Sequence, residues 1–384
     1  MNKNQKFPKG WKEVKLGEIG KFVSGTGFPE SEQGGKNGIP FYKVSDMNLE
    51  KNNKEMLVAN NYVNQEQIIR LKYKPIKEDA IIFAKVGAAI FLERKRLAKN
   101  FLIDNNMMAF IPINANLHFM KIILDKTRLS KFSQIGALPS YNASDLKIIK
   151  IAVPADIEEQ KAIAGALGIW DVGIEKLSQV IKLKEKQKKA IMQKLLSGKI
   201  RLSGFSKPWK EVKLGEVCEI KKGKQLGRLE MLENGSVPVM NGGILPSGFT
   251  NSFNENENTI TISEGGNSCG FVSLLKEKFW CGGHCYVLKN LKVEILFLFQ
   301  ILKQKEQEIM RLRVGSGLPN IQKTVIEKFS FYVPADIDEQ RAIAGTLSVC
   351  DEELALLNKK LALLREQKKS LMQQLLTGKM RLKF

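Results

Sequence analysis

The sequence predicts an α+β protein in which two small mixed α/β domains are separated by a long antiparallel two-helix coiled coil, pseudo-two-fold and quasi-cyclic. Three observations predict it: an internal duplication, a long helical segment in each copy, and a length of 384 residues, which suits two domains plus connecting elements. The predicted parts are a first domain at 1–152, a central helix at 153–203, a second domain at 204–332 and a C-terminal helix at 333–384.

The duplication is visible as exact or nearly exact repeats. The octapeptide Trp11–Glu18 recurs without change at Trp209–Glu216, an offset of 198 residues. The segment Val153–Gly165 recurs with two conservative changes at Val333–Gly345, an offset of 180 residues, and the eight residues from Leu195 recur at that same offset with two changes. The chain therefore consists of a variable, a constant, a second variable and a second constant segment.

Each constant segment has the start and stop signals of a helix. In the first copy Asp156 is a good N-cap, Glu159 is placed as its capping-box partner, and Gly198 suits the left-handed residue past a helix end. The second copy repeats all three signals 180 residues later. About 40 residues lie between the signals, which corresponds to roughly 60 Å of helix. Three glycines near the start of the first copy, Gly165, Gly168 and Gly173, predict a kink or break there.

Apolar residues in both helices alternate at intervals of four and three, a period of 3.5 that is typical of coiled coils. The predicted seam consists of Ile163, Leu167, Ile174, Leu177, Ile181, Ile191 and Leu195 in the first helix and Ile343, Leu347, Leu354, Leu357, Leu361, Leu364, Leu371 and Leu375 in the second. Each helix packing separately on its own domain is the alternative, and the matched lengths favour mutual pairing. Because the second helix leaves the second domain, it pairs with the first only by running back, which makes the pair antiparallel.

Charge and composition indicate the class of partner. The chain has 61 Lys and Arg against 40 Asp and Glu, a net charge of +21, which points to a polyanion such as nucleic acid or an anionic membrane surface. The polar, basic N-terminus lacks the apolar core of a signal peptide, and no apolar run approaches the roughly 20 residues of a membrane span. Five cysteines do not make a disulfide framework, so a reducing cytoplasm is expected.

Catalytic motifs are missing from the sequence. It has no phosphate-binding loop of the Gly-x-x-x-x-Gly-Lys-Ser/Thr type and no Gly-x-Gly-x-x-Gly loop. Asp156, Glu159 and Lys161 superficially form a nuclease-like carboxylate and lysine set, but helix capping accounts for the two acids. A zinc site is a further alternative, at Cys269, Cys281, His284 and Cys285; the adjacent last two residues and the lack of an equivalent in the first half favour buried free thiols and no metal. We therefore expect no enzyme activity in this chain.

The repeated motifs carry a family resemblance that covers essentially the whole chain. Trp11-x-x-x-x-Leu-Gly-Glu18 and its copy at 209–216, with Pro154 and Glu159-Gln160 and their copies 180 residues later, resemble the two ends of each target recognition domain in the specificity (S) subunits of type I restriction–modification systems. Weaker marks follow the same order in both halves, at 38–46 and 236–241, at 82–87 and 262–266, and at 136–140 and 315–320.

This resemblance implies a non-catalytic DNA-recognition subunit with two target recognition domains and two conserved helices. The implied target is double-stranded DNA with an asymmetric, bipartite sequence, one half for each domain, while the helix pair sets the spacer and docks partners. The implied partners are two methyltransferase (M) subunits and, through them, nuclease/translocase (R) subunits; these would hold S-adenosylmethionine, ATP and magnesium, and this chain no cofactor. One departure is that Lys85-Val86-Gly87 and Glu264-Gly265 stand where the family commonly has an Arg before the Gly.

Candidate DNA contacts fall into two groups. Basic residues expected at phosphates are Lys85, Arg94, Lys95 and Arg96 in the first domain and Lys222, Lys224, Arg228, Arg311 and Arg313 in the second. Candidates for reading bases are Ser24, Thr26, Lys43, Ser45, Ser140, Tyr141 and Asn142, with Gln225, Arg228, Asn241, Ser316, Asn320 and Gln322 in the second domain. Ordinary turn chemistry is the alternative for the Gly, Ser and Asn residues. The alternative function is a protein-binding assembly scaffold without sequence-specific DNA recognition, and a steep salt dependence of duplex binding separates the two.

Overall fold

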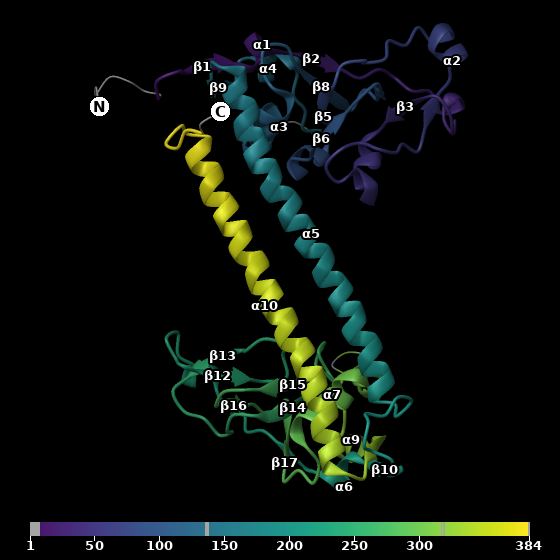
Figure 1. The fold of residues 1–384 in the computed structure, drawn as a ribbon, viewed down its shortest axis with the longest axis vertical. Coiled ribbons are helices and arrows are strands. Elements are labelled where there is room, and N and C mark those ends of the chain that lie inside the picture. Colours follow the sequence, from purple (N-terminus) through teal and green to yellow (C-terminus); the bar gives the residue numbers. More distant parts are fainter. Residues whose placement is uncertain (1–7, 135–137, 316, 318, 383–384) are drawn as a thin grey trace. The chain divides into compact units, whose positions relative to one another are not determined.

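The computed structural model describes residues 8–134, 138–315, 317 and 319–382 (Figure 1). The chain divides into two compact units, Met1–Glu175 with Ala362–Phe384, and Lys176–Leu361. Each unit contains one α/β domain, part of the first long helix and part of the second. The two helices thus belong to both units and do not form a domain of their own.

The domain of the first unit begins and ends in one antiparallel strand pair. Strand β1 (Trp11–Lys15) pairs with β9 (Lys150–Pro154), so that the Trp motif lies opposite the Val-Pro motif that opens the constant segment. Between them are two sheets, a four-stranded one in the order β2 (Gly20–Ser24), β8 (Met107–Pro112), β5 (Ala80–Ala84), β6 (Lys95–Ala98) and a three-stranded one in the order β4 (Tyr62–Val63), β3 (Ile39–Tyr42), β7 (Leu102–Ile103). Its α-helices are α1 (Leu16–Ile19), α2 (Gln65–Arg70), α3 (Leu117–Lys126) and α4 (Ala143–Lys147).

The domain of the second unit repeats this topology. Strand β10 (Trp209–Lys213) pairs antiparallel with β18 (Ser330–Pro334). The four-stranded sheet has the order β11 (Glu219–Lys222), β17 (Cys285–Lys289), β14 (Thr259–Ser263), β15 (Val272–Leu275), and the three-stranded sheet the order β13 (Gly248–Thr250), β12 (Val237–Met240), β16 (Trp280–Cys281). Its α-helices are α6 (Leu214–Val217), α7 (Ile295–Gln304), α8 (Glu306–Arg311) and α9 (Lys323–Glu327). The two variable segments therefore share one fold although their sequences differ.

The two constant segments are the long helices α5 (Ile157–Leu195) and α10 (Ile337–Leu375), of 39 residues each. The predicted stop signal is confirmed, because Gly198 and Gly378 adopt φ values of +68° and +66° just past the helix ends. The predicted break is wrong, since α5 is helical throughout the stretch that holds its three glycines. Neighbouring turns keep their hydrogen bonds there because a glycine weakens a helix without removing a backbone donor. Within the described residues, no helix is long and apolar enough to cross a membrane.

Inside each unit, α5 and α10 run antiparallel. In the second unit Lys184 pairs with Glu353 at 2.7 Å and Lys188 with Asp351, so the partner number falls as the α5 number rises. In the first unit Asp171 pairs with Lys368 at 2.6 Å. All fifteen seam positions are buried or half-buried, with Ile163, Leu167, Ile181, Leu195, Ile343, Leu347, Leu361 and Leu375 the most enclosed.

The helix seam and the domain cores are continuous in each unit. In the first unit Ile163, Leu167 and Leu375 belong to the same core cluster as Phe110 of β8 and Phe119 of α3. In the second unit the corresponding cluster joins seam residues of both long helices to β14, β17 and α7. In each unit the long helices therefore pack on the domain and on each other at the same time.

A buried glutamate holds the start of each long helix. In the second unit Glu339, fully enclosed, binds both Nε and Nη2 of Arg201 at 2.5 and 2.7 Å and lies 3.4 Å from the indole Nε1 of Trp209. The next residue, Gln340, donates to the carbonyl of Pro334 at 2.9 Å and accepts the backbone N–H of Glu294 at 2.8 Å. We call this set the Glu–Arg–Trp joint.

The first unit has the same joint made between residues far apart in the chain. Glu159 receives Nε and Nη2 of Arg381 at 2.5 and 2.7 Å and the indole of Trp11 at 3.3 Å. Arg381 also donates to the carbonyl of Lys9 at 2.7 Å. The C-terminal arm thus closes onto the first strand as the internal linker at Arg201 does in the second unit.

This joint corrects the predicted capping box. Asp156 does cap α5, because its Oδ1 accepts the backbone N–H of Glu158 at 2.9 Å. Glu159, however, turns inward to Arg381 and Trp11 and does not reach back to the N-cap. A long-range arginine, which short-range spacing does not reveal, prevails over the local cap.

Replacing Arg201 with Met is expected to destabilise the second unit by about 3–5 kcal/mol, because it leaves the Glu339 carboxylate buried and unpaired. Urea unfolding followed by tryptophan fluorescence measures the loss. The matched control is Arg341→Met, whose exposed pair with Asp338 is worth less than about 1 kcal/mol. Adding Glu339→Gln to Arg201→Met should recover part of the stability; equal losses for Arg201→Met and the control would contradict the role of the joint.

Candidate nucleic-acid interface

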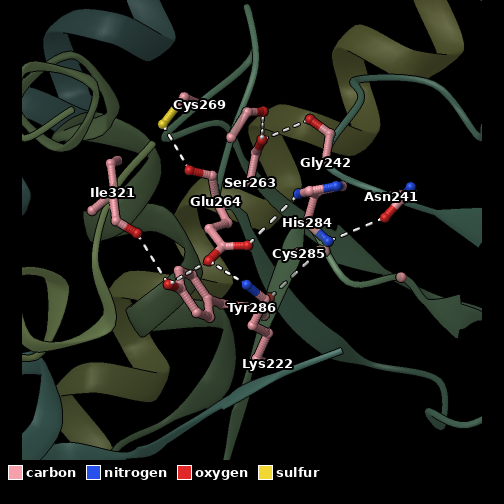
Figure 2. A network of polar contacts seen from close by, with 12 residues as sticks. Lys222, Asn241, Gly242, Ser263, Glu264, Cys269, His284, Cys285, Tyr286 and Ile321 are labelled. Carbon is pink, nitrogen blue, oxygen red and sulfur yellow. Dashed lines mark hydrogen bonds and ion pairs between the residues drawn. The ribbon is translucent and has the colours of Figure 1, made fainter. Parts of the chain in front are cut away.

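In the second domain, four loops next to strands and the loop that precedes α9 meet at one end of the four-stranded sheet, and Figure 2 shows polar contacts among them. The loops are 222–224, 240–241, 263–266, 281–285 and 319–322. They are fixed by backbone hydrogen bonds: Gly223 N–H donates to the carbonyl of Cys285, and Gly282 N–H to that of Met240, at 2.9 and 2.8 Å. We call this set the loop cluster of the second domain.

Glu264 lies at the centre of that loop cluster. Its Oε1 accepts from Nζ of Lys222 at 2.6 Å and lies 3.1 Å from the hydroxyl of Tyr286 (Figure 2). Its Oε2 is buried, makes no hydrogen bond within the described structure, and lies 3.9 Å from Nδ1 of His284. Burial raises the pKa of Tyr286, so its hydroxyl stays protonated as a donor.

The first domain has an equivalent loop cluster, formed by residues 24–26, 42–43, 84–87, 103–106 and 138–142. Its backbone hydrogen bonds match one for one: Gly25 N–H donates to the carbonyl of Met107, and Asp104 N–H to that of Tyr42, at 3.2 and 3.0 Å. Burial raises the pKa of Asp104, a buried residue of the loop 103–106. The match assigns each position of one domain to a position of the other.

Several candidate contacts predicted separately in the two domains occupy equivalent positions. Thr26 and Lys224 correspond, because their backbone N–H groups donate to the carbonyls of the equivalent residues Ile103 and Cys281. Lys43 and Asn241 correspond as the residues following the strands β3 and β12. By the same hydrogen bonds Ser24 matches Lys222, Ser140 matches Asn320, and Asn142 matches Gln322.

The surface exposure of the candidates varies. Exposed are Ser24, Thr26, Ser45, Asn142, Lys222, Lys224, Gln225, Arg228, Arg311, Arg313, Asn320 and Gln322; half-buried are Lys43, Lys85, Arg94, Arg96, Ser140 and Asn241. Ser316 lies outside the described residues, as do Gly136 and Ala137 of the segment 136–140. The remaining two, Lys95 and Tyr141, are buried.

The predicted DNA contacts at Lys95 and Tyr141 are wrong. Lys95 is 1% exposed and binds Glu93 at 2.5 Å and the carbonyl of Thr127 at 3.0 Å. Tyr141 is 3% exposed and donates its hydroxyl to the carbonyl of Ala84 at 2.6 Å, and burial raises its pKa. Both side chains satisfy polar groups inside the domain, which leaves none of their atoms for a phosphate or base.

Other candidates, Arg96 and Asn241 among them, have part of their hydrogen-bonding capacity used within the domain. Arg96 donates Nε to the carbonyl of Asn52 at 2.7 Å and Nη1 to that of Lys95 at 3.0 Å. Asn241 accepts the backbone N–H of His284 at 3.1 Å through Oδ1. Asn241 therefore shapes the loop at 281–285, whatever else its amide nitrogen contacts.

The residues of the alternative zinc site lie in different surroundings. Cys269, Cys281 and Cys285 are buried free thiols, while the side chain of His284 is 64% exposed. Among the described residues, no three His, Cys, Asp or Glu side chains are grouped closely enough to hold a metal ion. The thiols contribute to the cores beside β16 and β17.

Sequence reasoning did not select Glu264 or His284 as contacts. A charged residue directly after the apolar strand Thr259–Ser263 and before two glycines was an available signal for Glu264. His284 had no such signal, because its position beside Glu264 depends on the antiparallel pairing of β14 with β17, which sets Ser263 opposite Cys285.

The chain matches the family model described as "Type I restriction modification DNA specificity domain" twice, over residues 8–193 and 206–366. A putative type I specificity subunit of Mycoplasma pneumoniae is 36% identical over 166 residues, 42% of this chain and 44% of that protein; one of Mycoplasma genitalium is 34% identical over 149 residues. The chain thus matches less than half the length of each Mycoplasma relative. A specificity subunit of Methanocaldococcus jannaschii, of the type I restriction enzyme MjaVIII, is 25% identical over 98% of this chain and 95% of that protein.

Solved structures share the fold. The crystal structure of a type I restriction–modification S subunit from M. genitalium superposes with a TM-score of 0.67 at 20% identity, covering 98% of both chains. A structure described under complex assembly and conformational transition of the type I system has a TM-score of 0.56 at 17% identity. At these identities the likeness supports the arrangement of two domains and a long helix pair.

Exposed and buried lysines of the candidate interface are expected to behave differently. In the complete complex, Lys224→Gln should lower the slope of log affinity against log salt by about one, because it removes one phosphate contact. Lys95→Met should leave that slope unchanged and lower the unfolding temperature, because it unpairs Glu93. Fluorescence anisotropy with duplex DNA at several salt concentrations measures the first effect and thermal unfolding the second. A reduced slope in Lys95→Met would show that Lys95 does contact a phosphate.

Proposed function

The chain belongs to the type I restriction–modification DNA specificity family, and we propose that each of its two recognition domains reads one half of an asymmetric, bipartite DNA target. The observation that carries this proposal is the pair of loop clusters: one backbone framework occurs twice and presents different side chains each time. Two copies of one framework with unlike side chains suit two half-sites of unlike sequence.

The chain acts in this proposal as a non-catalytic subunit. Methylation, ATP hydrolysis and cleavage belong to two methyltransferase subunits and to nuclease/translocase subunits bound through them, which hold S-adenosylmethionine, ATP and magnesium. The described residues of both loop clusters include lysine, serine and asparagine side chains, with threonine in the first domain and glutamine in the second, which suit DNA contacts. The complex would act in the cytoplasm, where chromosomal DNA is accessible.

The long helices set the distance between half-sites. Both helices are unbroken and extend from one unit into the other, so each turn of helix adds a fixed rise. Half-sites of about 3–5 bp with centres about one turn of DNA apart, roughly 10 bp, fit a reader that approaches one face of the duplex. The exposed outer faces of the helices remain for the methyltransferase subunits.

Genome-wide mapping of N6-methyladenine tests the function. Cells that carry the complete system should show methylation at one asymmetric bipartite motif, and cells that lack this chain should lose it while keeping other methylation. Identical methylation with and without the chain would instead support the protein-binding scaffold.

Lengthening both helices tests the spacing mechanism. Inserting one heptad after Leu177 and one after Leu361 keeps the seam in register, because these positions face each other in the antiparallel pairing. Each insertion adds about 10 Å, so the preferred spacer should grow by roughly 3 bp. Methylome sequencing of the variant reads the spacer directly, and an unchanged spacer would rule the mechanism out. A heptad inserted in only one helix is the control, and it should impair assembly.

A further inference from the structure

Position 85 of the first domain and position 264 of the second are equivalent by their backbone contacts. The backbone N–H of Lys85 donates to the carbonyl of Asn106 at 2.8 Å, and the carbonyl of Lys85 accepts the backbone N–H of Tyr141 at 3.2 Å. The backbone N–H of Glu264 donates to the carbonyl of His284 at 2.9 Å, and the carbonyl of Glu264 accepts the backbone N–H of Ile321 at 2.8 Å.

The turns that follow these positions match as well. Gly87 and Gly266 have φ values of +82° and +77°, and their N–H groups donate to the carbonyls of Pro139 and Pro319 at 2.8 and 2.9 Å. Both turns form a β-bridge to the equivalent loops 138–142 and 319–322, at Ser140 in the first domain and Asn320 in the second. The same backbone position therefore carries opposite charge in the two domains.

A carboxylate at this position requires a reason, because DNA phosphates repel a negative charge. Oε1 of Glu264 is used by Lys222 and Tyr286. Oε2 has no hydrogen bond within the described structure, and a buried acceptor without a donor costs free energy. A base that supplies an amine donor would relieve this cost, which a phosphate or a base acceptor could not.

Among the base edges in the major groove, the exocyclic N4 amine of cytosine is the usual partner of a carboxylate, whereas O6 and N7 of guanine are partners of lysine. Resting on the function proposed above, we propose that 85 and 264 are equivalent specificity-determining positions of opposite polarity: Glu264 accepts from a cytosine in the second half-site, and Lys85 donates to a guanine in the first.

Nδ1 of His284 faces Oε2 of Glu264 in the unbound chain (Figure 2). The side chain of His284 is 64% exposed and its Nδ1 is 3.9 Å from Oε2, beyond hydrogen-bonding distance. Rotation of this exposed side chain would open the side of Oε2 that faces it, while Lys222 continues to hold Oε1. The carboxylate therefore stays oriented when the base arrives.

The test is selection from a randomised bipartite duplex library by the complete complex with its methyltransferase subunits, followed by sequencing of the bound DNA. Glu264→Gln should change the preference at one base of the second half-site from cytosine towards adenine, and Glu264→Lys should change it towards guanine, since glutamine pairs with adenine and lysine with guanine. Lys85→Glu should change one base of the first half-site from guanine towards cytosine. Each change should be about tenfold in relative preference and leave the other half-site as it was.

Matched controls carry the same charge changes at the far ends of the strands. Glu277→Lys follows β15 opposite the start of β14, and Lys77→Glu precedes β5; both residues are exposed. These controls should leave all base preferences unchanged. Glu264→Gln preserves the shape of the side chain, so it remains informative if Glu264→Lys impairs folding.

The inference is overturned if the unmodified complex selects a bipartite motif while Glu264→Gln and Lys85→Glu select that same motif with the same preferences, whatever their affinity. In that case Glu264 serves only to hold Lys222 and Tyr286. Failure of the unmodified complex to select any motif contradicts the proposed function itself, and so the two failures are distinct.

Discussion

The architecture depends on a carboxylate placed where water cannot reach it. Glu339 has no exposed surface, and an unpaired charge in such a place would cost several kcal/mol. Arg201 supplies two nitrogens to it and at the same time binds the carbonyl of Lys207 at 2.9 Å, which fixes the linker between the helix end and the second domain. One residue pair therefore joins the end of α5, the start of α10 and the first strand of a domain. The first unit repeats the arrangement with Arg381 and Glu159.

This joint explains which parts of the sequence are duplicated. The repeated tryptophan, the repeated Glu-Gln pair and the repeated Lys-x-Arg-Leu segment are the partners in it, and substituting any one of them would leave the others without their contacts. The described residues of the two loop clusters are not partners in either joint. They keep their backbone hydrogen bonds to one another, which side-chain changes do not disturb. Recognition can therefore change while the frame that holds it remains the same.

The sequence was sufficient for the architecture because periodicity and repeats report local, regular structure. The heptad spacing identified the seam of α5 and α10, and Gly198 and Gly378 marked their ends. Individual side-chain roles were less predictable because they depend on tertiary neighbours. Lysine is a residue type usually found at the surface, yet Lys95 lies buried against Glu93. Glu159 has the spacing of a capping residue, yet it binds an arginine more than 200 positions away. The identity of the base contacts depends on loop geometry that no local pattern encodes.

The two long helices differ in glycine content although they have the same length. Positions 168 and 173 of α5 are glycine, and the corresponding positions of α10 are Ser348 and Glu353. An added Cβ at either glycine would meet no atom within 4 Å, so packing does not require them. Each glycine in a helix interior costs about 0.8–1.0 kcal/mol relative to alanine. The amino-terminal part of α5 is consequently less stable as a helix than the corresponding part of α10. The first recognition domain is therefore attached to the more flexible of the two equivalent helix segments.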